Sequence, residues 1–488
     1  MLAIWGDSMS EIIKMNFKID NLNLVFGITG ILLTALTMSL ARLSIKTKRK
    51  EYYLLNFIYI LSFLIVIFSR RWLILLIGWE MVSVSTSLML LWKGRGLAGQ
   101  YFIVQFLGSS ILLYAILLAI NAGYSEIMPI KEVWLQNILI LGLGMKSAIF
   151  GLHFWLPPVH SQAPVPVSAV LSGWVVKLGF ITYLKIIPEG SNLLLILGFL
   201  MVFYGGIKAL LAIDYKVLLA YSSISQLGYI AIGIGSGVSY AYLGSILHII
   251  AHGLAKTALF LTNGCLIEEY GSRCIYDFKD AWQRQTVSCL SIIISFSSLM
   301  GIPLLAGYNS KHLIKHGMDS GQFFSILLFI SSLLTALYAL RFLYWGIFRD
   351  LLARRQRESS RARNKYQLRK FEYLSLFIII VLLLTVGLYG ELIVKIIKDI
   401  DFRYNFKTGF FEVIFYLLPA VFILKVFNCF KIKKQQTPSL DILFNRVNRY
   451  LDKLGRYLYN LIYKDFQYQL LWIPLFLFFL LYWELVFH

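Results

Sequence analysis

Residues 133–151, VWLQNILILGLGMKSAIFG, lead directly into residues 152–167, LHFWLPPVHSQAPVPV. The first segment is apolar and long enough to cross a bilayer core of about 30 Å, yet it contains a lysine, Lys146. The second segment holds four of the ten prolines of the chain, and prolines interrupt a helix. Non-helical backbone at membrane depth is tolerated only where it is buried in protein or lines water. The pair of segments therefore predicts a broken helix inside a membrane-embedded helical bundle.

Apolar segments of similar length recur along the 488-residue chain. Hydrophobic residues make up 58% of it and charged residues only 15%, against about a quarter in soluble proteins. Fourteen candidate spans follow, at 22–40, 52–69, 72–92, 100–120, 133–151, 167–187, 193–213, 217–235, 240–265, 286–306, 320–345, 371–391, 411–430 and 466–487. The sequence therefore predicts an all-α polytopic membrane protein with about 14 transmembrane helices.

The net charge is +21, and the basic residues responsible for it are distributed as the predicted topology requires. Basic residues concentrate in the gaps after alternate spans, at 42–50, 93–95, 214–216, 268–284, 349–370 and 431–464. The positive-inside rule then places these segments in the cytoplasm and the N-terminus outside, in the inner (plasma) membrane. The pair Arg70–Arg71 and the segment 395–407 depart from this pattern. We therefore attribute the charge to topology and expect no nucleic-acid partner.

No cofactor or metal site is expected from the sequence. The four cysteines show neither a CxxC motif nor Cys/His spacing typical of zinc or iron–sulfur ligands; they are Cys265, Cys274, Cys289 and Cys429. No quinone, flavin or nucleotide motif is recognisable. Residues 1–21 lack the basic start of a cleavable signal, so we expect the first span to direct insertion.

Seven titratable side chains fall inside or beside predicted spans, where an ionisable group is a functional candidate by default. They are Glu80, Lys146, Lys177, His248, His252, Lys256 and Lys311. His248, His252 and Lys256 recur every four residues and so share one helix face, extending about 12 Å along the axis. Burial favours the neutral amine and a carboxylate favours the charged one, while imidazole relays protons near neutral pH. The set therefore predicts proton transfer.

Each candidate also has a purely structural interpretation. Glu80 and Lys146 would then form a static buried ion pair. His248 would only donate to a backbone carbonyl. Lys177 and Lys311 would lie near the membrane surfaces and extend their amines to the headgroups.

A second interruption lies at Gly301–Pro303, shortly before Lys311. Broken helices in corresponding positions of two halves are typical of inverted-repeat transporters. We therefore predict two inverted repeats, at 52–187 and 193–345. The flanking parts are an N-terminal segment with the first span (1–51), a basic loop with two spans (346–430), and a C-terminal part (431–488) with an amphipathic lateral helix at 439–463 and a final span.

Six ordered motifs carry a resemblance to a known family. They are GWEM around Glu80, KSAIFGLHFWLPPVHSQAPVPVS at 146–168, LSGWVVKLG at 171–179, SSISQLGY at 222–229, HIIAHGLAKTALF at 248–260, and GIPLLAGYNSK at 301–311. With them, residues 22–345 resemble the antiporter-like subunits shared by respiratory complex I, membrane-bound hydrogenases and multisubunit sodium/proton antiporters.

This resemblance implies roles for the candidates. Glu80 and Lys146 would be the coupled carboxylate–lysine pair, Lys177, His252 and Lys256 the central relays, and Lys311 the exit-side lysine. His248 matches the family less closely. The carboxylate of the family lies in its fifth span, whereas Glu80 lies in the third span predicted here. Segment 439–463 looks like a short form of the lateral helix found in some members.

The predicted function is therefore proton translocation by one subunit of a multisubunit redox-driven membrane complex, such as a complex I-like or membrane-bound hydrogenase complex. Its partners would be other membrane subunits, a peripheral redox arm acting indirectly, the lipid bilayer, and protons, with sodium ions as a further substrate. The chain itself would perform no redox chemistry. Two alternatives stay open: a module of a sodium/proton antiporter without a redox partner, and a membrane scaffold that transports nothing.

Overall fold

A computed structural model describes residues 14–278, 280–318, 322–349, 370–398, 406–426, 449–450 and 453. In this part of the chain the regular elements are helices, and the extended contacts are three isolated bridges. The predicted all-helical fold class is confirmed for these residues. The basic run 354–363, most of the predicted lateral helix 439–463 and the predicted span 466–487 lie outside them.

The helices follow the predicted apolar segments closely. The described part before residue 190 contains α2 (Asn21–Ser39), η1 (Ala41–Leu43), α3 (Arg49–Phe68), α4 (Trp72–Leu90), α5 (Arg95–Asn121), α6 (Val133–Ser147), η2 (His153–Trp155), α7 (Leu156–Gln162), α8 (Val165–Gly173), η3 (Val175–Lys177) and α9 (Leu178–Ile186). The rest contains α10 (Asn192–Leu211), α11 (Tyr215–Gly235), α12 (Ser239–Tyr270), α13 (Ala281–Arg284), α14 (Thr286–Met300), α15 (Ala306–Gly317), α16 (Gln322–Leu343), η4 (Tyr344–Phe348), α18 (Lys370–Leu388), α19 (Gly390–Lys398) and α20 (Phe406–Val426).

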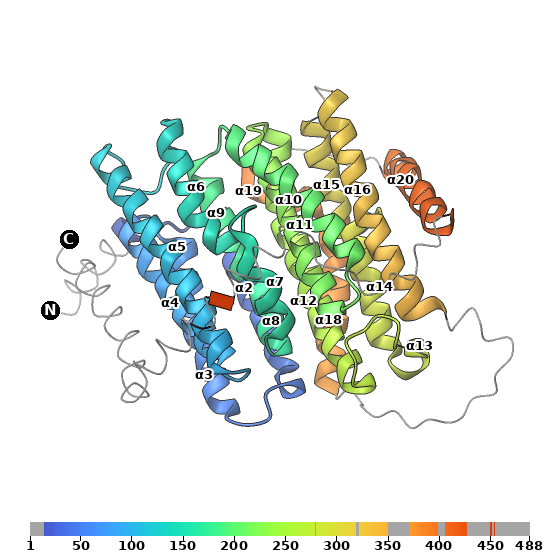
Figure 1. Cartoon of the computed structure of the whole chain (residues 1–488). Helices are drawn as coiled ribbons and strands as arrows, with labels where there is room; N and C mark the ends of the chain where they lie inside the picture. The colour runs from blue at the N-terminus through green and yellow to red at the C-terminus, as the bar shows by residue number, and fades with distance from the viewer. Residues whose placement is uncertain are drawn as a thin grey trace, which may run out of the picture.

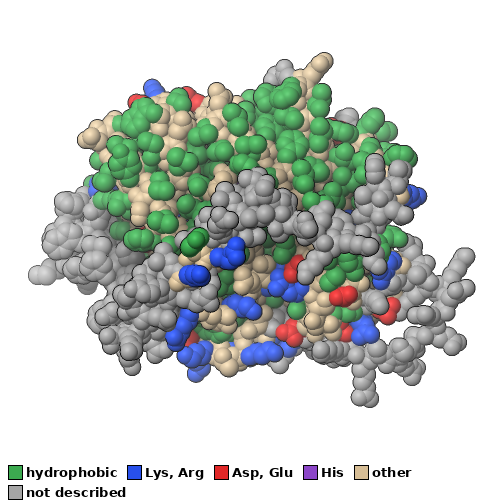
Figure 2. Space-filling model, in the orientation of Figure 1, with side chains coloured by type: hydrophobic (Ala, Val, Ile, Leu, Met, Phe, Trp, Pro, Cys, Tyr) green, Lys and Arg blue, Asp and Glu red, His purple; other side chains and the backbone are tan. Residues whose placement is uncertain are grey.

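Nine helical segments in the described residues are long and apolar enough to cross a membrane, with α8 to α9 and α16 to η4 each forming one segment. A tenth is added if α18 and α19, which meet at a bend of 68°, form one span. Figure 1 shows the long helices side by side in roughly one direction. Figure 2 shows a broad apolar surface over the upper part of this bundle and basic side chains along its lower margin. This is the surface expected of a multi-pass membrane protein.

The first predicted interruption separates α6 from α7. α6 ends at Ser147, because the next residue, Ala148, adopts a left-handed conformation with φ of 53°. The chain then turns through η2 and enters α7, whose first turn contains prolines. The indole of Trp155 donates a hydrogen bond to the carbonyl of Met145 at 2.8 Å and so satisfies a backbone group that the break exposes.

The second interruption separates α14 from α15. Gly301, with φ of 83°, ends α14 after only 15 residues, so the predicted span 286–306 is shorter than expected and continues as the separate helix α15. The two helices meet closely at Gly307, where a Cβ atom would stand 1.8 Å from the carbonyl oxygen of Ser298. Tyr416 of α20 donates a hydrogen bond to the freed carbonyl of Met300 at 2.7 Å.

The centre of the bundle is formed by α8–α9 and α12. Every residue in the apolar stretch of both segments is buried, whereas α5 and α10 are buried over less than half of theirs. Figure 1 shows α8, α11 and α12 in the middle of the row of helices. A side chain on the central helices is therefore surrounded by protein on all sides. Six of the seven predicted titratable groups lie on α6, η3, α12 and α15, at or beside this centre.

Candidate functional site

The six cationic or imidazole candidates are all buried. Lys146, Lys177 and the three candidates of α12 have no exposed surface, and Lys311 is 4% exposed. The alternative in which Lys177 and Lys311 extend their amines to the lipid headgroups is therefore wrong, because both side chains are buried inside the protein. Glu80 retains 19% exposure of its side chain.

Glu80 and Lys146 face each other from α4 and α6. Lys146 Nζ lies 3.8 Å from Glu80 Oε1 and donates a hydrogen bond to Ser83 Oγ at 3.0 Å. The ring of Trp79 lies below the amine, 5.1 Å from ring centre to Nζ. The carboxylate and the amine therefore attract each other without a direct short hydrogen bond. The hydrogen bond from Lys146 is made to Ser83 and not to the carboxylate.

Lys177 lies where the central span changes from α8 to α9. The backbone leaves α-helical geometry at Trp174 and continues as the 3-10 turn η3, which ends at Lys177. The amine of Lys177 folds back and donates to the carbonyl of Ser172 at 2.5 Å. A Cβ atom on Gly253 would stand 3.8 Å from Lys177 Cε, so this side chain lies against α12 next to His252.

Lys256 connects α12 to α11 through a serine hydroxyl and a backbone carbonyl. Its amine contacts Ser222 Oγ at 2.5 Å and the carbonyl of Leu219 at 3.0 Å. The neighbouring Ser223 exchanges a hydrogen bond of 2.8 Å with Ser172 Oγ on α8. Lys177 thus bonds the backbone carbonyl of Ser172, the hydroxyl of Ser172 bonds Ser223, and the next residue along α11, Ser222, bonds Lys256, so polar groups continue from Lys177 to Lys256. In the sequence, Ser222 and Ser223 are marked only by their place in the SSISQLGY motif, and Ser172 only by its place in LSGWVVKLG.

His252 and His248 extend this polar line along α12. Their rings stack nearly parallel, with centres 6.0 Å apart. No described residue hydrogen-bonds either ring nitrogen of His252. Buried polar atoms in proteins are normally satisfied, and where protein groups do not reach them a water does so. The His252 imidazole is thus oriented by packing and remains available to exchange a proton.

His248 connects α12 to the second broken helix. Its Nδ1 atom shares a hydrogen bond of 2.8 Å with Ser310 Oγ, so the predicted carbonyl partner is wrong. The next residue, Lys311, places its amine 4.3 Å from the ring centre of Tyr229, and that ring lies 5.7 Å from the His248 ring. No described residue hydrogen-bonds Lys311 Nζ. The structure therefore brings His248 and Lys311 together, although 63 positions separate them.

Three further buried groups were missed as candidates. His160 stacks on Phe260 at 5.5 Å, and no described residue hydrogen-bonds its ring nitrogens. Lys216 donates to the carbonyl of Ala163 at 2.7 Å, beside the first broken helix. Arg341 donates to the carbonyl of Ala212 at 2.9 Å. His160 was visible in the proline-rich motif, but its burial depends on how α7 packs and could not be read from that motif.

Comparisons with known proteins place these residues in a family. The family model described as "NADH:quinone oxidoreductase/Mrp antiporter, TM" matches residues 69–335, more than half of the chain. The chain belongs to this family. The matched segment contains all seven predicted candidates, from Glu80 to Lys311. The predicted resemblance is thereby confirmed.

Similar family members come from two kinds of complex. The chain is 33% identical over 215 residues to NADH-quinone oxidoreductase subunit N of Desulforudis audaxviator, covering 42% of this chain and 43% of the relative. It is 28% identical over 391 residues to the putative antiporter subunit mnhA2 of Staphylococcus haemolyticus, covering 69% of this chain and 49% of the relative. The chain thus spans about half the length of these curated relatives.

Solved structures show the same fold. A chain of the Mrp complex from Dietzia sp. DQ12-45-1b superposes with a TM-score of 0.74 at 22% identity, covering 95% of this chain and 55% of that chain. A chain of respiratory complex I from Thermus thermophilus with bound aureothin superposes with a TM-score of 0.65 at 23% identity, covering 79% of this chain and 90% of that chain. These structures therefore share the fold of this chain, in agreement with its membership of the family.

Proposed function

We propose that this chain translocates protons as one subunit of a multisubunit membrane complex whose redox partner lies elsewhere, as in a complex I-like or membrane-bound hydrogenase complex. The observation that supports this most is the buried polar line from Lys177 through Ser172, Ser223 and Ser222 to Lys256. Burying amines is costly, and this arrangement satisfies one of them with the backbone carbonyl of Ser172 and the other with the hydroxyl of Ser222, while the hydroxyls of Ser172 and Ser223 bond each other between them. Groups held in this way are suited to accept and release protons in turn.

Movement along the line follows from electrostatics. A second positive charge on a neighbouring buried amine or imidazole is disfavoured, because the low-dielectric interior screens their repulsion weakly. A proton arriving at one position therefore drives the next position to release its own. Glu80 is the carboxylate that stabilises a charged Lys146, so moving the two apart would favour proton release from that lysine. Water completes the steps at His252 and His160.

The architecture that fits this function is a pair of inverted repeats at 52–187 and 193–345. In the first, the fourth span is the broken α6–α7, and in the second it is the broken α14–α15. Each break adjoins a buried lysine, Lys146 or Lys311. Within this proposal the full chain has about 14 spans and a C-terminal lateral helix, lies in the inner membrane, and has its N-terminus outside.

A sodium/proton antiporter module is supported equally by the relatives, since one of them is a putative antiporter subunit and one neighbour is an Mrp complex. The two functions differ in their response to sodium. Proton transport that continues unchanged in sodium-free medium, and that depends on an electron donor, favours the redox-driven complex. Transport that requires sodium and no electron donor favours the antiporter.

The test of transport is Lys146→Ala in the assembled complex, measured as proton uptake in sealed vesicles. We expect uptake to fall by about a hundredfold or more, the effect of removing a positioned proton-transfer group, with assembly unchanged. Lys131→Ala is the matched control, because Lys131 is an exposed lysine in the loop between α5 and α6. Wild-type uptake in Lys146→Ala would refute the proposal and favour the scaffold function.

A further inference from the structure

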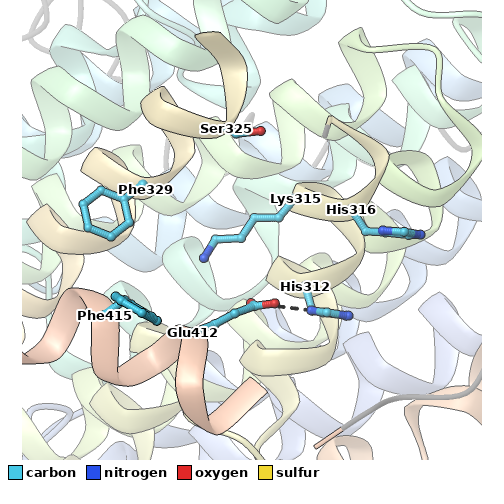
Figure 3. Close-up of a pocket in the computed structure, with 7 residues that line it drawn as sticks. All are labelled: His312, Lys315, His316, Ser325, Phe329, Glu412 and Phe415. Carbon is cyan, nitrogen blue, oxygen red and sulfur yellow. Dashed lines mark ion pairs between the residues drawn. The ribbon is translucent and has the colours of Figure 1, made fainter. Parts of the chain in front are cut away.

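An open pocket lies between α15, α16 and α20. The wall formed by α20 lies outside residues 69–335, the part of the chain that the family model matches. It has a volume of about 490 Å³ and is lined by His312, Lys315, His316, Ser325, Phe329, Glu412 and Phe415. Figure 3 shows Glu412 extending from α20 towards His312, with the Lys315 amine directed into the same space. The Glu412 side chain is 43% exposed, so the pocket reaches the protein surface.

A second, much smaller cavity lies directly behind this pocket. It offers about 10 Å³ to water, close to the minimum that holds one molecule. The buried Lys311 lines it together with Tyr416 and Ser332. His312, Lys315 and Glu412 line both cavities. These three charged or titratable side chains therefore form the boundary between the buried lysine and the open pocket.

Electrostatic contacts hold this boundary together. His312 Nδ1 lies 3.7 Å from Glu412 Oε2, and Lys315 Nζ lies 5.2 Å from the ring centre of Tyr416. The Tyr416 hydroxyl in turn donates a hydrogen bond to the carbonyl of Met300 at the end of α14. A change in the charge of Glu412 would therefore act on the second broken helix itself.

The titratable groups facing Glu412 are nitrogen bases and phenols. His312, Lys315 and His316 come from α15, and Tyr308 and Tyr416 line the smaller cavity. Glu412 is the carboxylate among the described residues that line the two cavities. It is thus the group best suited to accept a proton from an ammonium on the inner side of the boundary.

We propose that Glu412, held by His312 and Lys315, is the terminal proton acceptor and gate between Lys311 and the aqueous phase. The proposal rests on the proton-transport function above. The Lys311 ammonium gives one proton, through a water in the small cavity, to the Glu412 carboxylate, leaving a neutral amine and a carboxylic acid. The neutral acid no longer attracts His312, so it turns into the open pocket and releases the proton to water. The carboxylate then returns to His312.

The outlet would lie on the face opposite the basic margin. Figure 1 shows α15 and α20 in the upper part of the bundle and α13 at its lower end, while basic side chains line the lower margin in Figure 2. By the positive-inside rule, the pocket opens to the outer side of the membrane.

The test compares Glu412→Gln with Lys146→Ala in sealed vesicles containing the assembled complex. We expect Glu412→Gln to slow proton transport by about a hundredfold, and Glu412→Asp to retain most of the rate, because it keeps the titratable group. Glu126→Gln is the matched control: it removes a carboxylate from an exposed ion pair with Arg70, in the loop between α5 and α6. Wild-type transport in Glu412→Gln, with transport lost in Lys146→Ala, overturns the gate and leaves the proposed function intact.

A second measurement does not depend on assembly of the Glu412 variant. Ser325→Cys places a thiol on the pocket wall, where a bulky membrane-impermeant reagent can be attached. We expect labelling from the outer side to block transport relative to the same variant before labelling, and the same treatment of the unsubstituted chain to have no effect. Complete labelling that does not slow transport would overturn the proposal that protons leave through this pocket.

Discussion

Replacing Glu80 by Gln keeps the size of the side chain and removes the charge that faces Lys146. The two charged atoms lie 3.8 Å apart. At an effective dielectric constant of about 20, two unit charges at this separation interact by about 4 kcal/mol. That value is appropriate because the lysine is fully buried while the glutamate side chain is 19% exposed.

This free energy sets the expected loss of transport. If all of it stabilises the step that limits transport, the rate falls by about 1,000-fold, and if half of it does, by about 30-fold. We therefore expect Glu80→Gln to pump at no more than a few per cent of the wild-type rate. Glu80→Asp keeps the charge with a shorter side chain and should retain a larger share of the rate.

The assay is the initial rate of proton uptake into sealed vesicles, measured by a pH-sensitive dye while the activity that drives the complex is recorded in parallel. Assembly is checked by native gel electrophoresis. Glu126→Gln again serves as the control, because exposed ion pairs contribute only about 0–1 kcal/mol. Its partner Arg70 is 44% exposed and Glu126 itself 38%.

One result would refute the reasoning directly. If assembled Glu80→Gln pumps at more than half of the wild-type rate, the pair with Lys146 is a static structural contact. Equal losses in Glu80→Gln and Glu126→Gln would instead show that the assay responds to any carboxylate.

Two further predictions concern groups outside the proposed pathway. Glu372, 2% exposed, accepts two hydrogen bonds from Arg42, and removing one partner of a buried ion pair costs about 3–5 kcal/mol. Glu372→Ala should therefore lower the thermal midpoint in detergent, and Arg42→Met combined with Glu372→Leu should recover most of it; an unchanged midpoint in the single variant would contradict this. A hydrogen bond from Tyr124 lowers the pKa of Glu132, so the stabilisation is present above the ordinary pKa of a glutamate and is lost as the pH falls through the lowered value. Hydrogen-exchange protection of residues 122–132 should fall on acidification, and Tyr124→Phe should abolish that dependence.

Much of the pathway could be anticipated because its signals are local. A lysine within an apolar run is visible in the sequence, as Lys146 and Lys177 show, and so is the four-residue spacing of His248, His252 and Lys256. The structural partners were not visible. Ser172 and Ser223 become part of the polar line only because the fold brings α8 and α11 close at this point and places the two hydroxyl oxygens 2.8 Å apart.

The same distinction explains the missed groups. Arg42 and Glu372 are 330 positions apart, and each alone resembles an ordinary charge at the end of a helix. Glu412 lies in an apolar helix, but its significance depends on His312 approaching from α15.

Hydrophobic length, proline and glycine positions and charge placement are properties of short segments, and they established a multi-pass helical membrane protein with broken helices and buried amines. They do so because the bilayer imposes the same two requirements on every segment. Its backbone groups must be hydrogen-bonded within the protein, and a charged side chain at membrane depth must have a partner or a function that outweighs its cost. The partners of each buried charge depend on which helices pack side by side, and at which rotation and depth. Only tertiary packing specifies those distances, so the Ser83 contact of Lys146, the polar line between Lys177 and Lys256, and the boundary at Glu412 became visible only in the folded chain.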